Sequence, residues 1–212
     1  MTALRATAEV ETATPVQRQV MDLPTATSAR LEQLRRDFGH LEGAQLLEAM
    51  INKAFPGKIA MVSSFGSEAV VLLHLLSEVD PTVPVLFLNT GKLFGETLRY
   101  RDRLQDKLGL TDIRSLGPDP RIEAEADPNG DLWARDTDGC CHFRKVLPLA
   151  HGLRGFEASI TGRKQFQTGA RKAMPTIEQE ANEDGSPGRF KINPLANRSE
   201  EHTSELQSLT NL

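Results

Sequence analysis

The sequence of 212 residues contains only two cysteines, and they are adjacent, at positions 140 and 141. Two cysteines cannot build a disulfide framework, so we expect a reducing compartment and a cytoplasmic protein. No apolar run reaches the roughly 18–20 residues of a membrane span, and the first residues lack the apolar stretch of a secretion signal. The formal net charge of −4 lacks the basic excess that nucleic-acid-binding domains show, so we expect no nucleic-acid partner.

The cysteine pair is a candidate metal site. Adjacent cysteines are badly placed to bond to each other, but they can give two thiolates to one soft metal centre. Such a centre normally has four ligands, so the pair is half of a set. In a helix, Arg144 and Lys145 would follow Cys140 and Cys141 by one turn and would lower the thiol pKa values. The alternative is a pair of small buried thiols.

The apolar pattern alternates between strand and helix periods, which indicates an α/β fold. Strands are predicted at 58–62, 83–88, 112–116, 158–161 and 189–195, with helices at 28–38, 44–55, 67–79, 94–108 and 141–153. Residues 117–139 are rich in Pro, Gly and Asp and are predicted to form a long loop. This order predicts a doubly wound, mostly parallel sheet that binds ligands at the carboxyl ends of its strands.

The chain divides into three parts by composition. Residues 1–27 are expected to form a flexible arm, and residues 28–197 one α/β domain. Residues 198–212 (RSEEHTSELQSLTNL) are polar and have no apolar period. We therefore expect a non-native or disordered tail there, such as foreign DNA joined to a truncated gene would encode.

The segment SSFGSE at 63–68 follows the first predicted strand. Small hydroxyl residues and a glycine between a strand and a helix favour an anion cradle of N–H groups and hydroxyls. A plain helix cap, with Ser67 as the capping residue, is the alternative. The Gly-Lys-Ser/Thr of a Walker loop is absent.

Two further segments follow predicted strands. NTGKLF at 89–94 occupies the position of a ligand loop, although an ordinary turn would have the same residues. TGRKQFQ at 161–167, with Arg171 and Lys172 after it, has four cations in ten residues, which suits a multiply charged anion. A solvated basic loop is the alternative for this segment.

Taken together, the segments resemble the assimilatory sulfonucleotide reductases, which reduce adenylyl sulfate (APS) or its 3′-phosphorylated form (PAPS). The resemblance rests on SSFGSE, LNTGKLFGETLRYRD, DGCCHFRKVLPL, ITGRKQFQ and KINPLA, in this order, and covers about residues 30–197. It implies an adenine-nucleotide α-hydrolase-like fold and thiol-dependent reduction of APS to sulfite and AMP, in sulfate assimilation and cysteine biosynthesis.

The resemblance also implies a site. A cysteine pair marks the iron–sulfur, APS-preferring subgroup, so Cys140 and Cys141 would be two of the four ligands of a 4Fe–4S cluster. Lys145 would lie between cluster and substrate. The implied sulfonucleotide-binding residues are Ser63, Ser64, Phe65, Gly66, Ser67, Thr90, Gly91, Lys145, Gly162, Arg163 and Arg171. Thioredoxin or glutaredoxin would be the reductant, and the sequence leaves open whether the chain forms a homo-oligomer.

The last residues depart from this family. Its members continue after NPLA to a C-x-x-C pair, the other two cluster ligands, and to a final nucleophilic cysteine. This sequence has no cysteine after Cys141, so we expect an inactive chain without a catalytic residue. PAPS reduction, a related ATP-pyrophosphatase-type enzyme and a non-catalytic nucleotide-binding remnant are the alternatives; SSFGSE lacks the second Gly and the Asp of the pyrophosphatase loop.

Overall fold

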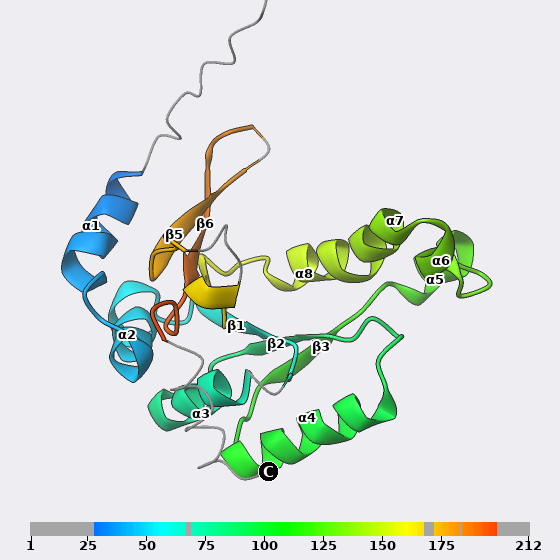
Figure 1. Ribbon diagram of the computed structural model, residues 1–212, viewed down its shortest axis with the longest axis horizontal. Helices are drawn as coiled ribbons and strands as arrows, with labels where there is room; N and C mark the ends of the chain where they lie inside the picture. The colour runs from blue at the N-terminus through cyan, green and yellow to red at the C-terminus, as the bar shows by residue number, and fades with distance from the viewer. Residues whose placement is uncertain (1–27, 67–68, 168–171, 183, 199–212) are drawn as a thin grey trace, which may run out of the picture.

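The computed structural model describes residues 28–66, 69–167, 172–182 and 184–198, which surround a six-stranded sheet (Figure 1). The strand order is β3-β2-β1-β4-β6-β5. The strands are β1 (Ile59–Ser63), β2 (Val85–Leu88), β3 (Ile113–Leu116), β4 (Ala158–Ile160), β5 (Ile177–Ala181) and β6 (Pro187–Ile192). All pairings are parallel except the antiparallel pairing of β5 with β6. The predicted α/β class with a mostly parallel sheet is confirmed.

Helices precede, connect and cover these strands. The α-helices are α1 (Ala29–Phe38), α2 (Gly43–Ala49), α3 (Ala69–Val79), α4 (Gly95–Leu108), α5 (Pro120–Ala126), α6 (Leu132–Arg135), α7 (Thr137–Cys141) and α8 (Leu147–Gly152). Two π-helical segments, η1 (Met50–Ala54) and η2 (His142–Val146), continue α2 and α7, and a 3-10 turn, η3 (Gln165–Gln167), follows β4. None of the helices in the described ranges is long and apolar enough to cross a membrane.

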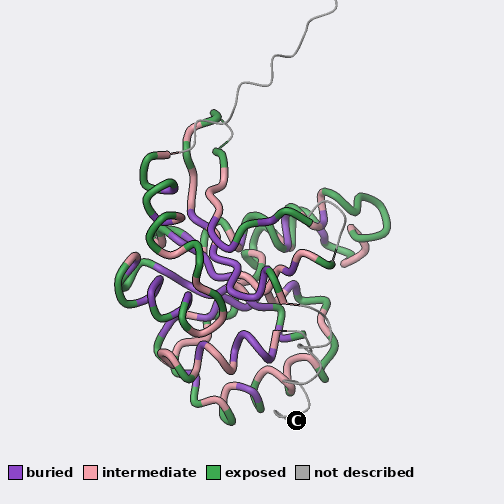
Figure 2. The backbone as a smooth tube through the Cα atoms, turned by 60° about the vertical axis from the view of Figure 1, so that its left-hand side comes forward, coloured by how far each residue is buried: buried purple, intermediate pink, exposed green. Residues whose placement is uncertain are grey.

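Successive residues of β1 point to opposite faces of the sheet and enter two different cores. Ile59 and Met61 belong to the large core, which also contains apolar side chains of α1, α2, α3 and α4. Ala60 belongs to a smaller core with Leu86 and Leu153, and Leu149 of α8 packs against it. Figure 2 shows the buried backbone running through the middle of the molecule. Burial on both faces explains why β1 and β2 are continuous apolar runs.

The prediction of a loop over residues 117–139 is wrong, because α5, α6 and the start of α7 lie there. The Asp and Pro residues that favour a loop act here as helix-start signals. Asp119 accepts a hydrogen bond from the Arg121 amide (2.8 Å), and Pro120 occupies the first turn of α5. Asp136 caps α7 in the same way by accepting from the Gly139 amide (2.9 Å). Short helices with such caps have too few apolar positions to show a helical period.

Strand β5 was not predicted. Its sequence, IEQEA, places Ile177 in the core, while three polar residues and an exposed alanine follow, as expected for an edge strand. The antiparallel pairing turns β5 and β6 into a hairpin at one side of the sheet (Figure 1). The strand predicted at 189–195 corresponds to β6, which begins two residues before the predicted start and ends three residues before the predicted end.

Helix α1 packs against the free side of β5. The Ser28 hydroxyl caps α1 and donates to the Gln179 side-chain oxygen (2.6 Å). The Arg35 guanidinium donates to the Ile177 carbonyl (3.0 Å). The expected arm at 1–27 lies outside the described residues, as does the expected tail except for Arg198.

Candidate active site

The loop after β1 turns sharply at Phe65. This residue has a φ of 53°, in the left-handed region that an aromatic residue rarely adopts. Its ring is buried against Phe87 in an edge-on contact (5.4 Å between centroids), and its amide donates to the Ser63 hydroxyl (3.1 Å). Ring burial and the hydrogen bond hold the strained turn. Strain that the surroundings maintain in this way is common at ligand-binding loops.

A cavity of about 290 Å³ opens where the loops after β1 and β4 meet. It is lined by Ser63, the last residue of β1, by Ser64 from the loop after β1, and by Thr161, Gly162 and Arg163 from the loop after β4. The strand order reverses between β1 and β4, and doubly wound sheets bind ligands at such a point. The structure therefore brings together two segments that lie about a hundred residues apart in the sequence, with hydroxyl groups and one guanidinium around one space.

A second cavity, of about 320 Å³, surrounds the cysteine pair. Its lining combines the loop after β2 with the helical segment that contains the cysteines. The lining residues are Thr90, Lys92, Trp133, Thr137, Cys140, Cys141, Arg144 and Lys145. The predicted grouping of both cysteines with Lys145 is thus seen at one cavity. Cys140 is buried at 8% exposure, while Cys141 is partly exposed, and both thiols are free.

The cysteines lie on a helix that begins earlier than predicted. The predicted start was residue 141, but α7 begins at Thr137 and continues through η2 and α8. A Cβ at Gly139 would lie 2.2 Å from Oδ2 of the capping Asp136, so any other residue there would displace this cap. The continuous helix is what places Lys145 beside the same cavity as Cys141.

Arg144 does not act as the exposed cation that the helical spacing suggests. Its side chain is 2% exposed and binds two carboxylates, Asp127 at 2.5 Å and Glu123 at 2.6 Å. It also donates to the Thr90 carbonyl (2.8 Å). One guanidinium therefore joins α5, the residue after α5 and the loop after β2 to the cysteine helix. Glu123 and Asp127 lie in the stretch that was predicted as a loop, where isolated acids give no signal of such a role.

The carboxyl group of Asp127 is fully buried and is held as an anion. The hydrogen bond from Arg144 is the main cause that lowers its pKa, and the amide of Leu132, which donates at 2.9 Å, adds to the effect. Burial alone would raise the pKa, but these contacts outweigh it. The ion pair is thus stabilised in its charged form within the protein.

The loop after β2 is shaped by its own side chains. Gly91 has a φ of +71°, and its amide donates to the Asn89 side chain (3.2 Å). The Thr90 hydroxyl accepts from the Lys92 amide (3.3 Å), and the Lys92 ammonium reaches the Gly130 carbonyl (2.8 Å). These contacts fix a tight turn in which a glycine is required at position 91, since left-handed backbone is costly for other residues. The loop presents Thr90 and Lys92 to the cysteine cavity.

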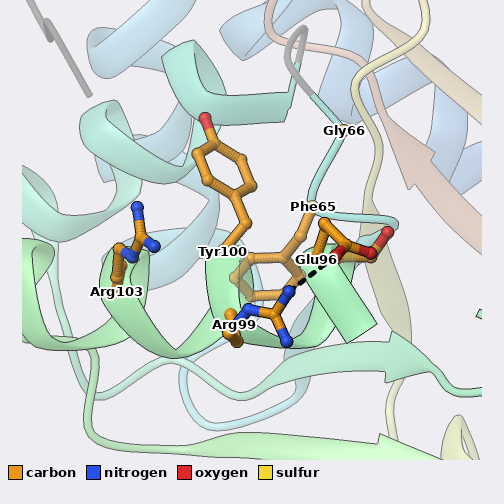
Figure 3. Close-up of a pocket in the computed structure, with 7 residues that line it drawn as sticks. Phe65, Gly66, Glu96, Arg99, Tyr100 and Arg103 are labelled. Carbon is orange, nitrogen blue, oxygen red and sulfur yellow. Dashed lines mark hydrogen bonds and ion pairs between the residues drawn. The ribbon is translucent and has the colours of Figure 1, made fainter. Parts of the chain in front are cut away.

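A third cavity, of about 510 Å³, lies between Phe65 and Gly66 and helix α4 (Figure 3). Arg99 forms an ion pair with Glu96 (2.6 Å) in front of the Phe65 ring, while Tyr100 extends from α4 away from it. Burial raises the pKa of Tyr100. The first loop therefore borders two cavities, with Ser63 and Ser64 on one side and Phe65 and Gly66 on the other.

The predicted binding residues line these three cavities with three exceptions. Gly91 lies in the loop after β2 but is not part of the lining of any of the three. Ser67 and Arg171 lie outside the described residues, and so does the predicted cap at Ser67. Phe65 and Gly66 line the third cavity and not the first. The pattern did not indicate Glu178, which forms an ion pair with Arg163.

The residues available to a metal are few. Within the described ranges no three or more His, Cys, Asp or Glu side chains gather as a metal site. Cys140 and Cys141 could supply two thiolates from adjacent positions beside one cavity, which is half of what an iron–sulfur cluster needs. These residues alone do not fit a complete cluster.

Fold and cavities define the class. The parallel sheet reverses its strand order between β1 and β4, and the cavities open beside the loops that follow β1, β2 and β4. This is a doubly wound α/β protein with its candidate binding cavities at the carboxyl ends of the parallel strands.

Comparison with known proteins gives the family. The chain belongs to the phosphoadenosine phosphosulfate reductase domain family, whose model matches residues 58–212. An adenosine 5′-phosphosulfate reductase from Mesorhizobium japonicum is 43% identical over 175 residues, which are 82% of this chain and 66% of the relative. A relative of the same name from Chelativorans is 41% identical and is covered to 69%. The chain thus spans about two thirds of the length of these relatives.

A solved structure has the same fold. The phosphoadenylyl-sulfate reductase from Candida auris, in a phosphate complex, superposes with a TM-score of 0.70 at 23% identity. The match covers 88% of this chain and 89% of that one. This likeness agrees with the predicted fold, and the family model and the relatives confirm the predicted membership of the sulfonucleotide reductases.

Proposed function

We propose that the chain contains the nucleotide-binding part of an enzyme that reduces adenylyl sulfate to sulfite and AMP, in sulfate assimilation. The observation that carries the proposal is its 43% identity over 175 residues to a relative named adenosine 5′-phosphosulfate reductase. The two cavities beside the strand ends support it, because one offers anion-binding groups and the other offers thiols and a lysine. APS is the preferred substrate in this proposal, and PAPS is the alternative.

The first cavity is the proposed place of the nucleotide anion. Ser63, Ser64 and Gly162 border it with small side chains, so that a phosphate could approach the backbone closely. Arg163 offers a permanent positive charge, which offsets the repulsion that would oppose attack on an anionic substrate. Thr90 and Gly91 shape the neighbouring loop, and Phe65, Gly66, Ser67 and Arg171 complete the proposed set.

The second cavity is the proposed place of the reacting sulfate end. Lys145 lines it beside Cys141, so a cation could interact there with a sulfate group and with thiolates. Cys140 and Cys141 are proposed to give two of the four ligands of a 4Fe–4S cluster in the complete enzyme. Such a cluster would supply local electrostatic stabilisation. The cysteines present fall short of four, so no chemical step of this chain depends on it.

The proposed reaction needs a third thiol. A cysteine thiolate attacks the sulfur of the substrate, the sulfur–oxygen bond to the phosphate breaks, and AMP leaves with the electron pair. Thioredoxin or glutaredoxin then attacks the resulting S-sulfocysteine and releases sulfite. Neither Cys140 nor Cys141 is proposed as the nucleophile. We therefore expect no sulfite from APS and thioredoxin with this chain, and measured sulfite release would contradict that part of the proposal.

Nucleotide binding tests the proposal directly. Calorimetric titration is expected to show binding of APS and AMP and weaker binding of ATP. Arg163→Ala removes a charge-assisted hydrogen bond, worth about 1.5–3 kcal/mol, and should weaken APS binding roughly ten- to hundredfold. Arg154→Ala is the matched control, because Arg154 is exposed and precedes β4, whereas Arg163 follows it. ATP binding as tight as APS binding, or equal effects of the two substitutions, would refute the assignment.

A second candidate is a nucleotide-binding protein without catalysis. The lining of the first cavity favours it, because that lining offers hydroxyl groups and a guanidinium for an anion and includes no cysteine. Adding the C-terminal segment of the Mesorhizobium japonicum relative to this chain separates the two. Sulfite formation by the extended chain supports the enzyme, and nucleotide binding without any sulfite supports the second candidate.

A further inference from the structure

Four side chains form a closed ring of hydrogen bonds beside the first cavity. Glu178 accepts from Nη2 of Arg163 and from Nδ2 of Asn193, the latter at 2.8 Å. The Thr161 hydroxyl donates to Oδ1 of Asn193 (2.5 Å), and Nε of Arg163 donates back to the Thr161 oxygen (3.3 Å). The ring therefore links the residues that follow β4 and β6 to the middle of β5.

The ring is anchored by the backbone of the sheet. Thr161 donates its amide to the Ile192 carbonyl (2.9 Å), directly after the last residue pair of β4 and β6. Asn193 is fully buried, and its amide and side chain bind the carbonyls of Thr176 (2.8 Å) and Pro175 (3.1 Å). Three neighbouring strands thus fix the two neutral members of the ring, which gives the other two a rigid base.

The ring uses two of the three guanidinium nitrogens of Arg163. Its Nε and Nη2 atoms are used by Thr161 and Glu178, while Nη1 has no partner among the described residues. Arg163 and Thr161 both line the cavity of about 290 Å³ with Ser63 and Ser64. The side chains of Arg163 and Glu178 are each 27% exposed, so water and ions can reach the pair. An anion in this cavity would meet a guanidinium whose direction is already set.

We propose that Glu178 is a positioning residue that orients Arg163 toward an adenylyl phosphate group in this cavity. This inference rests on the proposed function. A free arginine side chain samples many rotamers and loses that freedom when it binds an anion, so a held guanidinium binds at lower entropic cost. The carboxylate also offsets part of the positive charge, which opposes binding. At this exposure solvent screens that effect, and orientation outweighs it.

Glu180 offers a matched control on the same strand. Glu178 is the register partner of Lys191 in β6, and Glu180 forms an ion pair with the same lysine, so both carboxylates lie on one face of β5. Glu180 forms ion pairs with Arg189 (3.9 Å) and Lys191, and its side chain is 36% exposed. Glu180→Gln therefore removes a carboxylate of similar exposure that holds other cations and not Arg163.

The test compares AMP with adenosine, which lacks the phosphate group. Calorimetry on this chain should show AMP bound about tenfold more weakly by Glu178→Gln, with the adenosine affinity unchanged. Glu180→Gln should stay within about twofold of the unsubstituted chain for both ligands. Thr161→Val removes another hydrogen bond of the ring and should also weaken the binding of AMP but not that of adenosine. It provides a second variant if Glu178→Gln unfolds.

Each other outcome counts against the inference. Unchanged AMP binding by Glu178→Gln and Thr161→Val, or an equal loss of AMP and adenosine binding, would show a structural role only. If the unsubstituted chain binds neither AMP nor APS, the proposed function fails at the same time. The unsubstituted chain could instead bind both ligands, with binding weakened by Arg163→Ala and not by Glu178→Gln. In that case only the positioning role of Glu178 fails.

Discussion

Substitution of Arg144 by methionine would leave a buried carboxylate without its main partner. Arg144 is 2% exposed and Asp127 is fully buried, so water cannot replace the guanidinium without opening the structure. The Thr90 carbonyl would lose its donor as well. Breaking a buried pair from one side costs about 3–5 kcal/mol of the free energy of unfolding. For a chain of this size, that loss lowers the melting temperature by roughly 10 °C.

Thermal and urea unfolding, followed by circular dichroism, would measure this loss. The matched control is Arg135→Met, because Arg135 and Asp131 form an exposed pair with side chains 54% and 47% accessible. Exposed pairs contribute less than about 1 kcal/mol, so this control should unfold close to the unsubstituted chain. The double variant Arg144→Met/Asp127→Leu should regain part of the loss, since apolar residues can replace a buried pair.

Equal effects of Arg144→Met and Arg135→Met would refute this reasoning. A cost for Arg144→Met below about 1 kcal/mol would do the same, because it would place the pair in the range of exposed ion pairs. A double variant less stable than Arg144→Met would show that the unpaired Asp127 is not the source of the loss.

The remaining predictions concern pH and helix capping. Since Arg144 lowers the pKa of Asp127, this pair should stabilise the protein above the ordinary carboxyl pKa of 3.8 and lose that effect as pH falls through the lower folded value. Asp127→Asn should therefore flatten the fall of unfolding free energy in acid, and a fall as steep as before would contradict this. Gly139→Ala should displace Asp136 and cost about 0.5–2 kcal/mol, the worth of a helix cap. Denaturant titration checks the second effect, and unchanged stability would show that the cap can move without loss.

The fold was predictable where burial leaves a pattern in the sequence. The runs in β1 and β2 are apolar because both faces of these strands are covered, and α4 shows a clear helical period. The helices α5 and α6 have no buried residue, so no period could indicate them. Strand β5 was not predicted for a similar reason, since only its first residue, Ile177, is buried.

The candidate site was predictable as a set of segments but not as a network. Glycines, hydroxyls and cations after strands indicated the loops that line the first two cavities. The acidic partners of the arginines could not be predicted, because Asp127 and Glu178 lie in segments without a motif. Only the folded chain brings them next to Arg144 and Arg163. Asn193 belongs to the recognised segment KINPLA, yet its contact with Thr161 depends on the pairing of β4 with β6.

The contact between α1 and β5 affects how the chain can be shortened. Arg35 binds the Ile177 carbonyl on the side of β5 that faces away from the sheet. A version that begins after residue 38 would expose this side, together with the apolar surface that Leu31 and Leu34 cover. Bare sheet edges pair with other chains and aggregate. Residues 28–38 are therefore part of the smallest unit that should be expressed, although they lie outside the range that matches the family.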